Sequence, residues 1–227
     1  TLFPYTTLFR SVMRTLLATA VLLLGTLGTA PAQEADSTDW TPLFSGDSLD
    51  GWAHVGKGTF VLDEGRLRTV GGMGLLWYTE RKLGEVLLRV EYMSPSRDNA
   101  GVFIRIPERP TDPWMPVHRG YEVQIDPTGD ATHRTGTLYS LTEAQAEAGG
   151  APGTWHTMTI RLAGDRTVVH VNDTLVTDYT EGDPVPPKEA SYEPDRGPRP
   201  ERGYIGLQNH APADTVYIRR VAVRPLR

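Results

Sequence analysis

A seven-residue stretch, 120–126 (GYEVQID), carries polar side chains at every second position. Glu122, Gln124 and Asp126 alternate there with Tyr, Val and Ile, and this alternation predicts a β-strand with one apolar and one polar face. The polar side chains would stand about 7 Å apart along the strand. An acid, an amide and an acid in such a row can bind a sugar or a metal ion. A half-exposed strand with a solvent-facing polar side shows the same pattern.

The same two-residue period can be applied to two other segments. A strand over residues 101–105 would present Arg105 on the same face as its glycine, and a strand over residues 206–210 would present Gln208 and His210 beside its own glycine. We therefore expect three strands to bring polar groups to one face, where the two glycines leave room for a ligand. Simpler explanations stay open, because a strand arginine commonly pairs with an exposed acid and a lone histidine at a strand end is often incidental.

Aromatic residues and histidines elsewhere are less specific. Tyr139 suits a core or rim position as well as a sugar-stacking platform, and Trp114, in a segment bracketed by prolines, suits a packing anchor as well as a lid. The remaining histidines do not show the i, i+4 spacing typical of metal ligands. The chain also contains no glycine-rich phosphate loop, no serine nucleophile elbow and no nucleic-acid motif.

Residues 13–32 have the organisation of a secretory signal peptide. Met13 and Arg14 begin a basic region, residues 16–27 form an apolar run, and residues 30–32 (APA) provide small residues for cleavage. The apolar run is too short for a comfortable membrane span. We therefore predict a secreted or periplasmic bacterial protein with no membrane attachment after cleavage.

The rest of the chain divides into three parts. Residues 1–12 precede the expected initiator methionine and are interpreted as a non-native upstream stretch, residues 33–39 as a short linker, and residues 40–227 as one domain with a sizeable core. The chain has no cysteine and a formal net charge of −5. We expect no disulfide bond, and the acidic balance argues against nucleic acid or an anionic membrane as a partner.

Short strand-like runs, separated by glycine, proline, aspartate and asparagine, predict an all-β sandwich for the domain. Residues 171–174 (VNDT) predict a tight hairpin, because Asn and Asp tolerate left-handed turn geometry. A short turn or helix is expected at residues 142–148, and the proline-rich residues 181–202 are expected to form an ordered rim beside a site. The predicted strands are 60–62, 66–70, 75–78, 86–93, 101–106, 121–125, 136–139, 155–162, 167–171, 174–179, 204–209 and 216–223.

Several of these motifs, in this order, resemble the 3-keto-disaccharide hydrolase domain family, which was long known only as a domain of unknown function. The resemblance covers essentially all of residues 40–227. Many relatives read Gln-Asp-His-Gly where this chain has QNHA at 208–211, but Asn209 should point inward, so Gln208 and His210 should keep their roles. The matching segments are 41–52 (TPLFSGDSLDGW), 99–105 (NAGVFIR), 120–125 (GYEVQI), 135–139 (TGTLY), 153–157 (GTWHT), 171–173 (VND), 206–210 (GLQNH) and 221–226 (VAVRPL).

The resemblance implies a concanavalin- or laminarinase-like jelly-roll sandwich that cleaves 3-keto-glycosides by hydrolysis or β-elimination. A ketone at C3 acidifies the C2 proton, so His210 or a desolvated Glu122 could remove it as a base. Arg105, or a divalent metal ion held by Glu122 and His210, would stabilise the developing enolate. The substrate, a small carbohydrate, would be bound by Gln124, Gln208, Tyr139 and Trp114.

Two alternatives compete with this interpretation. A non-catalytic, lectin-like carbohydrate-binding module uses the same sandwich; it needs an aromatic platform and tolerates loss of the acid. An ordinary glycosidase needs two carboxyl groups at a fixed separation, and Glu122 with Asp126 is the only nearby pair on the predicted strand. The enzyme requires instead that Glu122, Arg105 and His210 converge.

Overall fold

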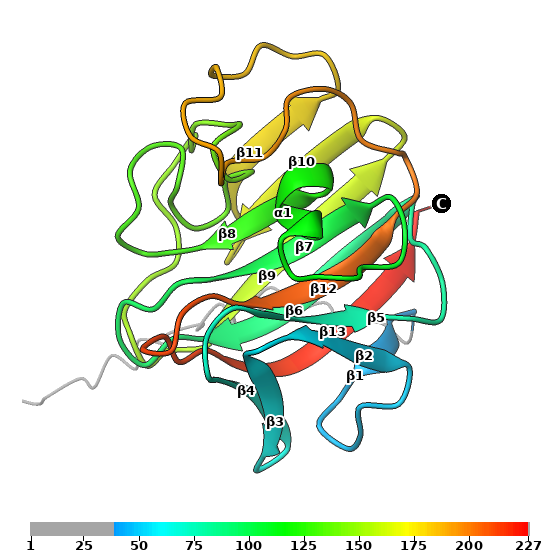
Figure 1. Ribbon diagram of the computed structural model, residues 1–227, viewed down its shortest axis with the longest axis vertical. Helices are drawn as coiled ribbons and strands as arrows, with labels where there is room; N and C mark the ends of the chain where they lie inside the picture. Colours follow the sequence, from blue (N-terminus) through cyan, green and yellow to red (C-terminus); the bar gives the residue numbers. More distant parts are fainter. Residues whose placement is uncertain (1–38, 227) are drawn as a thin grey trace, which may run out of the picture. The chain divides into compact units, whose positions relative to one another are not determined.

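The computed structural model describes residues 39–226, which form two antiparallel β-sheets and one short helix (Figure 1). The predicted upstream stretch, the signal peptide and residues 33–38 of the linker lie outside the described residues. The larger sheet has the strand order β11-β10-β9-β6-β13-β4-β3, with β1 paired to β13, and the smaller sheet has the order β2-β5-β12-β7-β8. No helix within residues 39–226 is long and apolar enough to cross a membrane.

Most strand bounds follow the predicted runs closely. The smaller sheet contains β2 (Trp52–Gly56), β5 (Gly74–Tyr78), β7 (Ala100–Ile106), β8 (Tyr121–Ile125) and β12 (Tyr204–Asn209). The larger sheet contains β1 (Thr41–Phe44), β3 (Thr59–Asp63), β4 (Arg66–Val70), β6 (Val86–Met93), β9 (His156–Ala163), β10 (Arg166–Val171), β11 (Thr174–Thr180) and β13 (Tyr217–Pro225). The helix α1 (Met115–Arg119) lies against β7 and β8 on the outer face of the smaller sheet (Figure 1).

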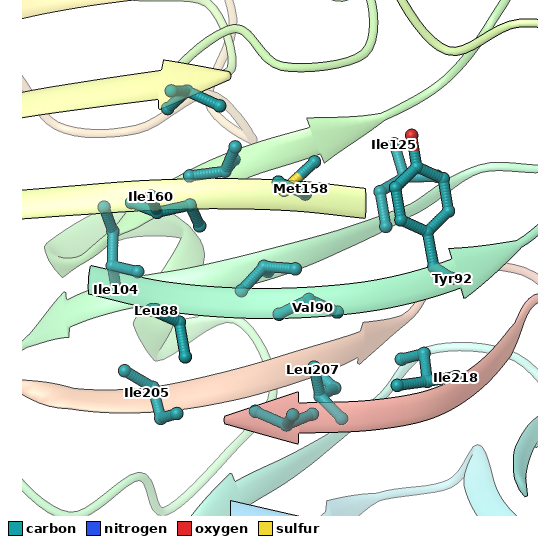
Figure 2. Packing of buried hydrophobic residues seen from close by; sticks show 14 of the residues in the cluster. Leu88, Val90, Tyr92, Ile104, Ile125, Met158, Ile160, Ile205, Leu207 and Ile218 are labelled. Atoms are coloured by element: carbon teal, nitrogen blue, oxygen red, sulfur yellow. The ribbon is translucent and has the colours of Figure 1, made fainter. Parts of the chain in front are cut away.

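The core lies between the two sheets, where alternate residues of each strand point inward. Figure 2 shows the facing side chains, which come from β6, β9 and β13 of the larger sheet and from β7, β8 and β12 of the smaller one. A second apolar cluster lies on the outer face of the smaller sheet under α1, and includes Leu75, Trp77, Phe103, Ile106, Met115 and Val117. The predicted all-β sandwich is confirmed, with apolar side chains on both faces of the smaller sheet.

The predictions of individual turns, helices and strands had different outcomes. The hairpin at residues 171–174 is confirmed, since Asn172 and Asp173 have φ values of 48° and 66° and Val171 pairs with Thr174. Residues 142–148 were expected to form a short turn or helix, and they form no helix but contain a bend at residues 145–146. The strand expected at 136–139 is reduced to a single bridge between Leu138 and Val123. Prediction missed β1, β2 and α1.

A β-bulge interrupts the alternation in β7. Gly206 pairs with Phe103 and Tyr204 pairs with Ile106, so two residues of β7 stand opposite one residue of β12. Arg105 is the extra residue of this bulge and has a φ of 53°. The alternation therefore predicts the wrong face for Arg105, which turns away from the outer face.

Arg105 instead reaches the larger sheet and is completely buried. Its guanidinium donates hydrogen bonds to Thr167 Oγ1 (3.2 Å), to the carbonyl oxygens of Gly164 (2.9 Å) and Arg166 (3.1 Å), and to the carbonyl oxygen of Pro200 (3.1 Å). Burial lowers the pKa of Arg105, and Glu181 and Tyr121 oppose that change. The side chain therefore joins β7 to the β9–β10 hairpin and to the loop that precedes β12.

Replacing Arg105 with leucine should destabilise the fold by about 3 kcal/mol or more, because one hydroxyl and three carbonyl oxygens lose a charged donor inside the protein. Urea unfolding measures the change. The exposed Arg81 provides the control, since Arg81→Leu should stay within about 0.5 kcal/mol of the wild type. An Arg105→Leu protein of wild-type stability would contradict this structural role.

Candidate functional site

Three adjacent strands build the floor of the site. Gln208 of β12 pairs with Gly101 of β7, and Gly101 pairs with Gln124 of β8. The two glutamines therefore flank Gly101 in one row, and Glu122 stands in the next row opposite Phe103. The sequence left open whether these strands are neighbours, and the pairing shows that they are.

Position 101 requires a glycine because the side chain of Glu122 lies directly over it. A Cβ atom at Gly101 would stand 2.6 Å from Glu122 Oε1 and 2.7 Å from its Cγ, closer than real Cβ contacts. The other glycine, Gly206, faces Leu75, whose Cδ1 would be 2.6 Å from an added Cβ. The room expected above these two glycines is thus filled by Glu122 and Leu75 rather than left for a ligand.

A cavity of about 250 Å³ opens beside these residues. Six of the seven predicted site residues line it: Trp114, Glu122, Gln124, Tyr139, Gln208 and His210. The lining is completed by Met73, Asn99, Val117 and Tyr192. The seventh predicted residue, Arg105, is not among them, because its guanidinium bonds to β10, the β9–β10 turn and the loop before β12.

Glu122 is the buried acid of this cavity. Only 6 % of its surface is exposed. Burial raises the pKa of Glu122 to about 8, although a hydrogen bond from the Gln208 side chain acts in the opposite direction. A carboxyl group with this pKa is mostly protonated at neutral pH and can donate a hydrogen bond or a proton.

Three amide oxygens of the cavity lack a hydrogen-bond partner among the described residues: Asn99 Oδ1, Gln124 Oε1 and Gln208 Oε1. Buried polar atoms without partners are rare in folded proteins. Asp126, the last member of the predicted row, lies outside the cavity lining; it accepts a hydrogen bond from Asn99 Nδ2 (3.5 Å) and from Thr128. Prediction missed Asn99, although it directly precedes β7.

His210 lies at the mouth of the cavity beside a carboxylate that prediction also missed. Its Nδ1 is 2.8 Å from Asp214 Oδ2, and the imidazole side chain is 45 % exposed. No hydrogen bond to Nε2 occurs among residues 39–226, so this nitrogen is free to act on a ligand. The i, i+4 spacing of His210 and Asp214 was a signal in the sequence. Asn209, between the two, faces inward as expected, since its Nδ2 donates to the carbonyl oxygens of Thr59 and Val70.

Aromatic side chains form the rest of the mouth. Tyr139 is placed by the segment that runs beside β8, where its backbone N–H donates to the carbonyl oxygen of Glu122 (2.9 Å). Burial, followed by the nearby charge of Glu122, raises the pKa of Tyr139. Trp114 precedes α1 and is 47 % exposed, and Tyr192 is 58 % exposed.

Tyr192 comes from the proline-rich loop of residues 181–202, which carries part of the rim as the sequence suggested. Two arginines of the loop attach it to neighbouring segments. Arg199 donates to the carbonyl oxygens of Gly120 (2.9 Å) and His118 (2.9 Å), and Arg196 donates to that of Ser140 (3.3 Å). The loop is therefore tied to the C-terminal end of α1 and to the segment that carries Tyr139.

The structure gives no support to a metal centre built on Glu122 and His210. Residues 39–226 contain no group of three or more His, Cys, Asp or Glu side chains placed to hold a metal ion. His210 already uses Nδ1 for Asp214. We therefore derive no step through a metal ion.

The two sheets and the lined cavity define a β-sandwich protein, and comparisons with solved structures agree on the fold. A proposed glycosyl hydrolase from Parabacteroides distasonis matches with a TM-score of 0.68 and 24 % identity, over 82 % of this chain and 99 % of the other. A carbohydrate-binding module from Bacillus subtilis matches with a TM-score of 0.54 and 14 % identity, over 77 % and 95 %. A Bacillus subtilis protein of unknown function with a galectin-like fold gives 0.58 and 14 %, over 82 % and 94 %.

No curated protein sequence matches the chain. The family model described as the 3-keto-alpha-glucoside-1,2-lyase-like domain matches residues 39–224. The chain therefore belongs to this family, and the resemblance drawn from its motifs is confirmed.

Gly101→Ala should displace Glu122, because the new methyl group would occupy the place of its carboxyl and Cγ atoms. We expect the side chain to move towards solvent and the pKa of Glu122 to fall back towards its ordinary value. A crystal structure and an NMR titration of the variant measure both. Gly206→Ala is the matched control, since it meets Leu75 instead. An unmoved Glu122 in the Gly101→Ala protein would contradict the close packing described here.

Proposed function

We propose that this domain is an enzyme that cleaves the glycosidic bond of 3-keto-glycosides. The observation that carries the proposal is the buried Glu122, whose pKa of about 8 keeps it protonated, in one cavity with the free Nε2 of His210. A proton donor and a proton acceptor at one small site suit a reaction that removes one proton and supplies another. Membership of the family supports the same substrate class.

His210 acts as the base in this scheme. Its Nε2 removes the C2 proton, which the C3 ketone has made acidic, and the electron pair moves to the C3 oxygen as an enolate. The enolate then re-forms the ketone and expels the C1 substituent by β-elimination. Asp214 holds Nδ1 and stabilises the imidazolium that forms, so it is a positioning residue for His210.

Glu122 acts as the neutral acid. A protonated carboxyl group in an apolar setting can hydrogen-bond to a developing oxyanion, as an aspartic acid does in ketosteroid isomerase. This group takes the role that the sequence assigned to Arg105, whose guanidinium is bonded elsewhere. Proton transfer from Glu122 to the departing C1 oxygen completes the elimination and yields a 3-keto-2-hydroxy-glucal. Addition of water to that product gives net hydrolysis.

The sugar binds through the amide oxygens of Asn99, Gln124 and Gln208 and through the aromatic mouth formed by Tyr139, Trp114 and Tyr192. Residues 13–32 direct export to the periplasm or the medium in this proposal, as their signal-like pattern suggests.

A non-catalytic carbohydrate-binding module is the second candidate. It is favoured by one observation: two of the three large hydrophobic side chains exposed in the described residues, Trp114 and Tyr192, lie at this same mouth. Such a platform can hold a sugar without any chemistry. The two candidates differ in whether Glu122 and His210 are required.

A direct assay compares an aryl 3-keto-glucoside with its unoxidised parent glucoside, with and without chelator. We expect cleavage of the oxidised substrate alone, because only the C3 ketone acidifies the C2 proton. Cleavage of the parent alone would point to an ordinary glycosidase, and binding without cleavage would favour the binding module. Loss of turnover with chelator would place a metal ion in the reaction and contradict the metal-free roles given to Glu122 and His210.

Single substitutions test the roles proposed for His210, Glu122 and Asp214. His210→Ala and Glu122→Gln should each lower kcat by roughly 10²- to 10⁴-fold, the range typical of general acid–base groups. Asp214→Asn should lower kcat less and change its pH profile, because His210 loses its orienting carboxylate, and Asp214→Glu should restore part of the rate. Arg119, on the helix surface, offers a control, and Arg119→Ala should leave kcat unchanged. Wild-type turnover by Glu122→Gln would contradict the scheme.

A further inference from the structure

We propose that the cavity accepts only sugar rings that bear no negative charge at this site, and that it recognises them by their hydroxyl donors. Glycosides of uronic acids and sulfated or phosphorylated sugars would be rejected. This inference rests on the proposed function, since it narrows the substrate class of the same cavity. It is carried by the partnerless amide oxygens and by the charges of the lining residues.

Among the buried side-chain polar atoms of the lining residues, those without a partner are all acceptors. Asn99 Oδ1, Gln124 Oε1 and Gln208 Oε1 are buried and lack a partner among the described residues, and all three residues line the cavity. Gln124 and Gln208 are 1 % and 4 % exposed. Buried acceptors are normally paired, so a ligand that brings hydrogen-bond donors to them is favoured.

Neighbouring carboxyl groups set the direction of two of these amides. Asn99 Nδ2 donates to Asp126 Oδ2, and the Gln208 side chain donates to Glu122. With each NH₂ group turned to an acid, the oxygen of the same amide is left without a partner. The protein therefore fixes which end of these two amides is unpaired.

Among the described residues, no lysine or arginine lines the cavity. Groups in or against the lining that can carry charge include Glu122 in the floor, Asp126 behind Asn99, and His210, which is already paired with Asp214. The ring of His133 also lies 4.9 Å from that of the lining residue Tyr139. A carboxylate, sulfate or phosphate on the sugar brings only acceptors and a negative charge. It would face the amide oxygens without a hydrogen bond and raise the cost of ionising the acids beside it.

A hydroxyl group has the opposite effect. Each hydroxyl of a neutral pyranose can donate to one amide oxygen, and the neutral Glu122 can donate in return to a hydroxyl or carbonyl oxygen of the ring. Sites built to hydrogen-bond a particular group discriminate strongly against analogues that leave the site unpaired. We therefore expect a preference of roughly hundredfold or more in kcat/KM for the uncharged ring.

The test compares an aryl 3-keto-glucoside with the 3-keto-glucuronide of the same aglycone, which differs only in a carboxylate at C6. Turnover is measured with the wild type, and binding of both unoxidised parent glycosides is measured by calorimetry with the Glu122→Gln protein. The glucoside should be preferred in both turnover and binding. Equal turnover or equal binding of the glucuronide would overturn the inference.

A charge-introducing variant provides an independent check. Asn99→Arg should raise the glucuronide-to-glucoside ratio at least about tenfold, because it removes one acceptor and adds a cation at the rim. The control is Gln145→Arg, an equal charge change at an exposed residue outside the lining, which should leave the ratio unchanged. Equal effects of the two variants would contradict the inference. A binding preference that persists without cleavage of either keto-sugar would refute the proposed reaction while upholding the recognition of uncharged rings.

Discussion

The buried guanidinium of Arg105 is the interaction on which the arrangement of this sandwich depends. Its donors join β7 of the smaller sheet to Thr167, Gly164 and Arg166 of the larger sheet and to Pro200 in the loop before β12. A buried cation is tolerable only where such acceptors surround it. The bulge that turns Arg105 inward also fixes the register of β12 against β7, and that register places Gln208 beside Gly101 and Gln124.

The buried position of Arg105 also determines the charge of the cavity. With Arg105 turned between the sheets, the described lining residues include no permanent cation, and only the hydrogen bond from Gln208 favours the ionised form of Glu122. Burial then raises its pKa, so that the floor of the cavity is a neutral acid surrounded by amide oxygens. The same placement that stabilises the sandwich thus favours chemistry by a protonated carboxyl group and recognition of uncharged, hydroxyl-bearing ligands.

Much of this arrangement is predictable from alternation alone. The period of two in β8 and β12 assigns Glu122, Gln124 and Gln208 to one face. The residue types Asn172 and Asp173 predict the hairpin turn. Alternation fails at Arg105, because one extra residue in a bulge reverses the face and nothing in the local sequence marks it. The spacing of His210 and Asp214 is a signal that alternation does not interpret, because the two side chains meet only through the turn after β12.

The protonation of Glu122 in the free protein tests the central claim most directly. With glutamate labelled at the side-chain carboxyl carbon, NMR can follow this group through pH, and Glu122→Gln identifies its signal. Burial in the cavity predicts a carboxyl that is still protonated at neutral pH and titrates near 8. A Glu122 carboxyl that is already ionised at pH 6, with a pKa close to that of a glutamate in water, would contradict it.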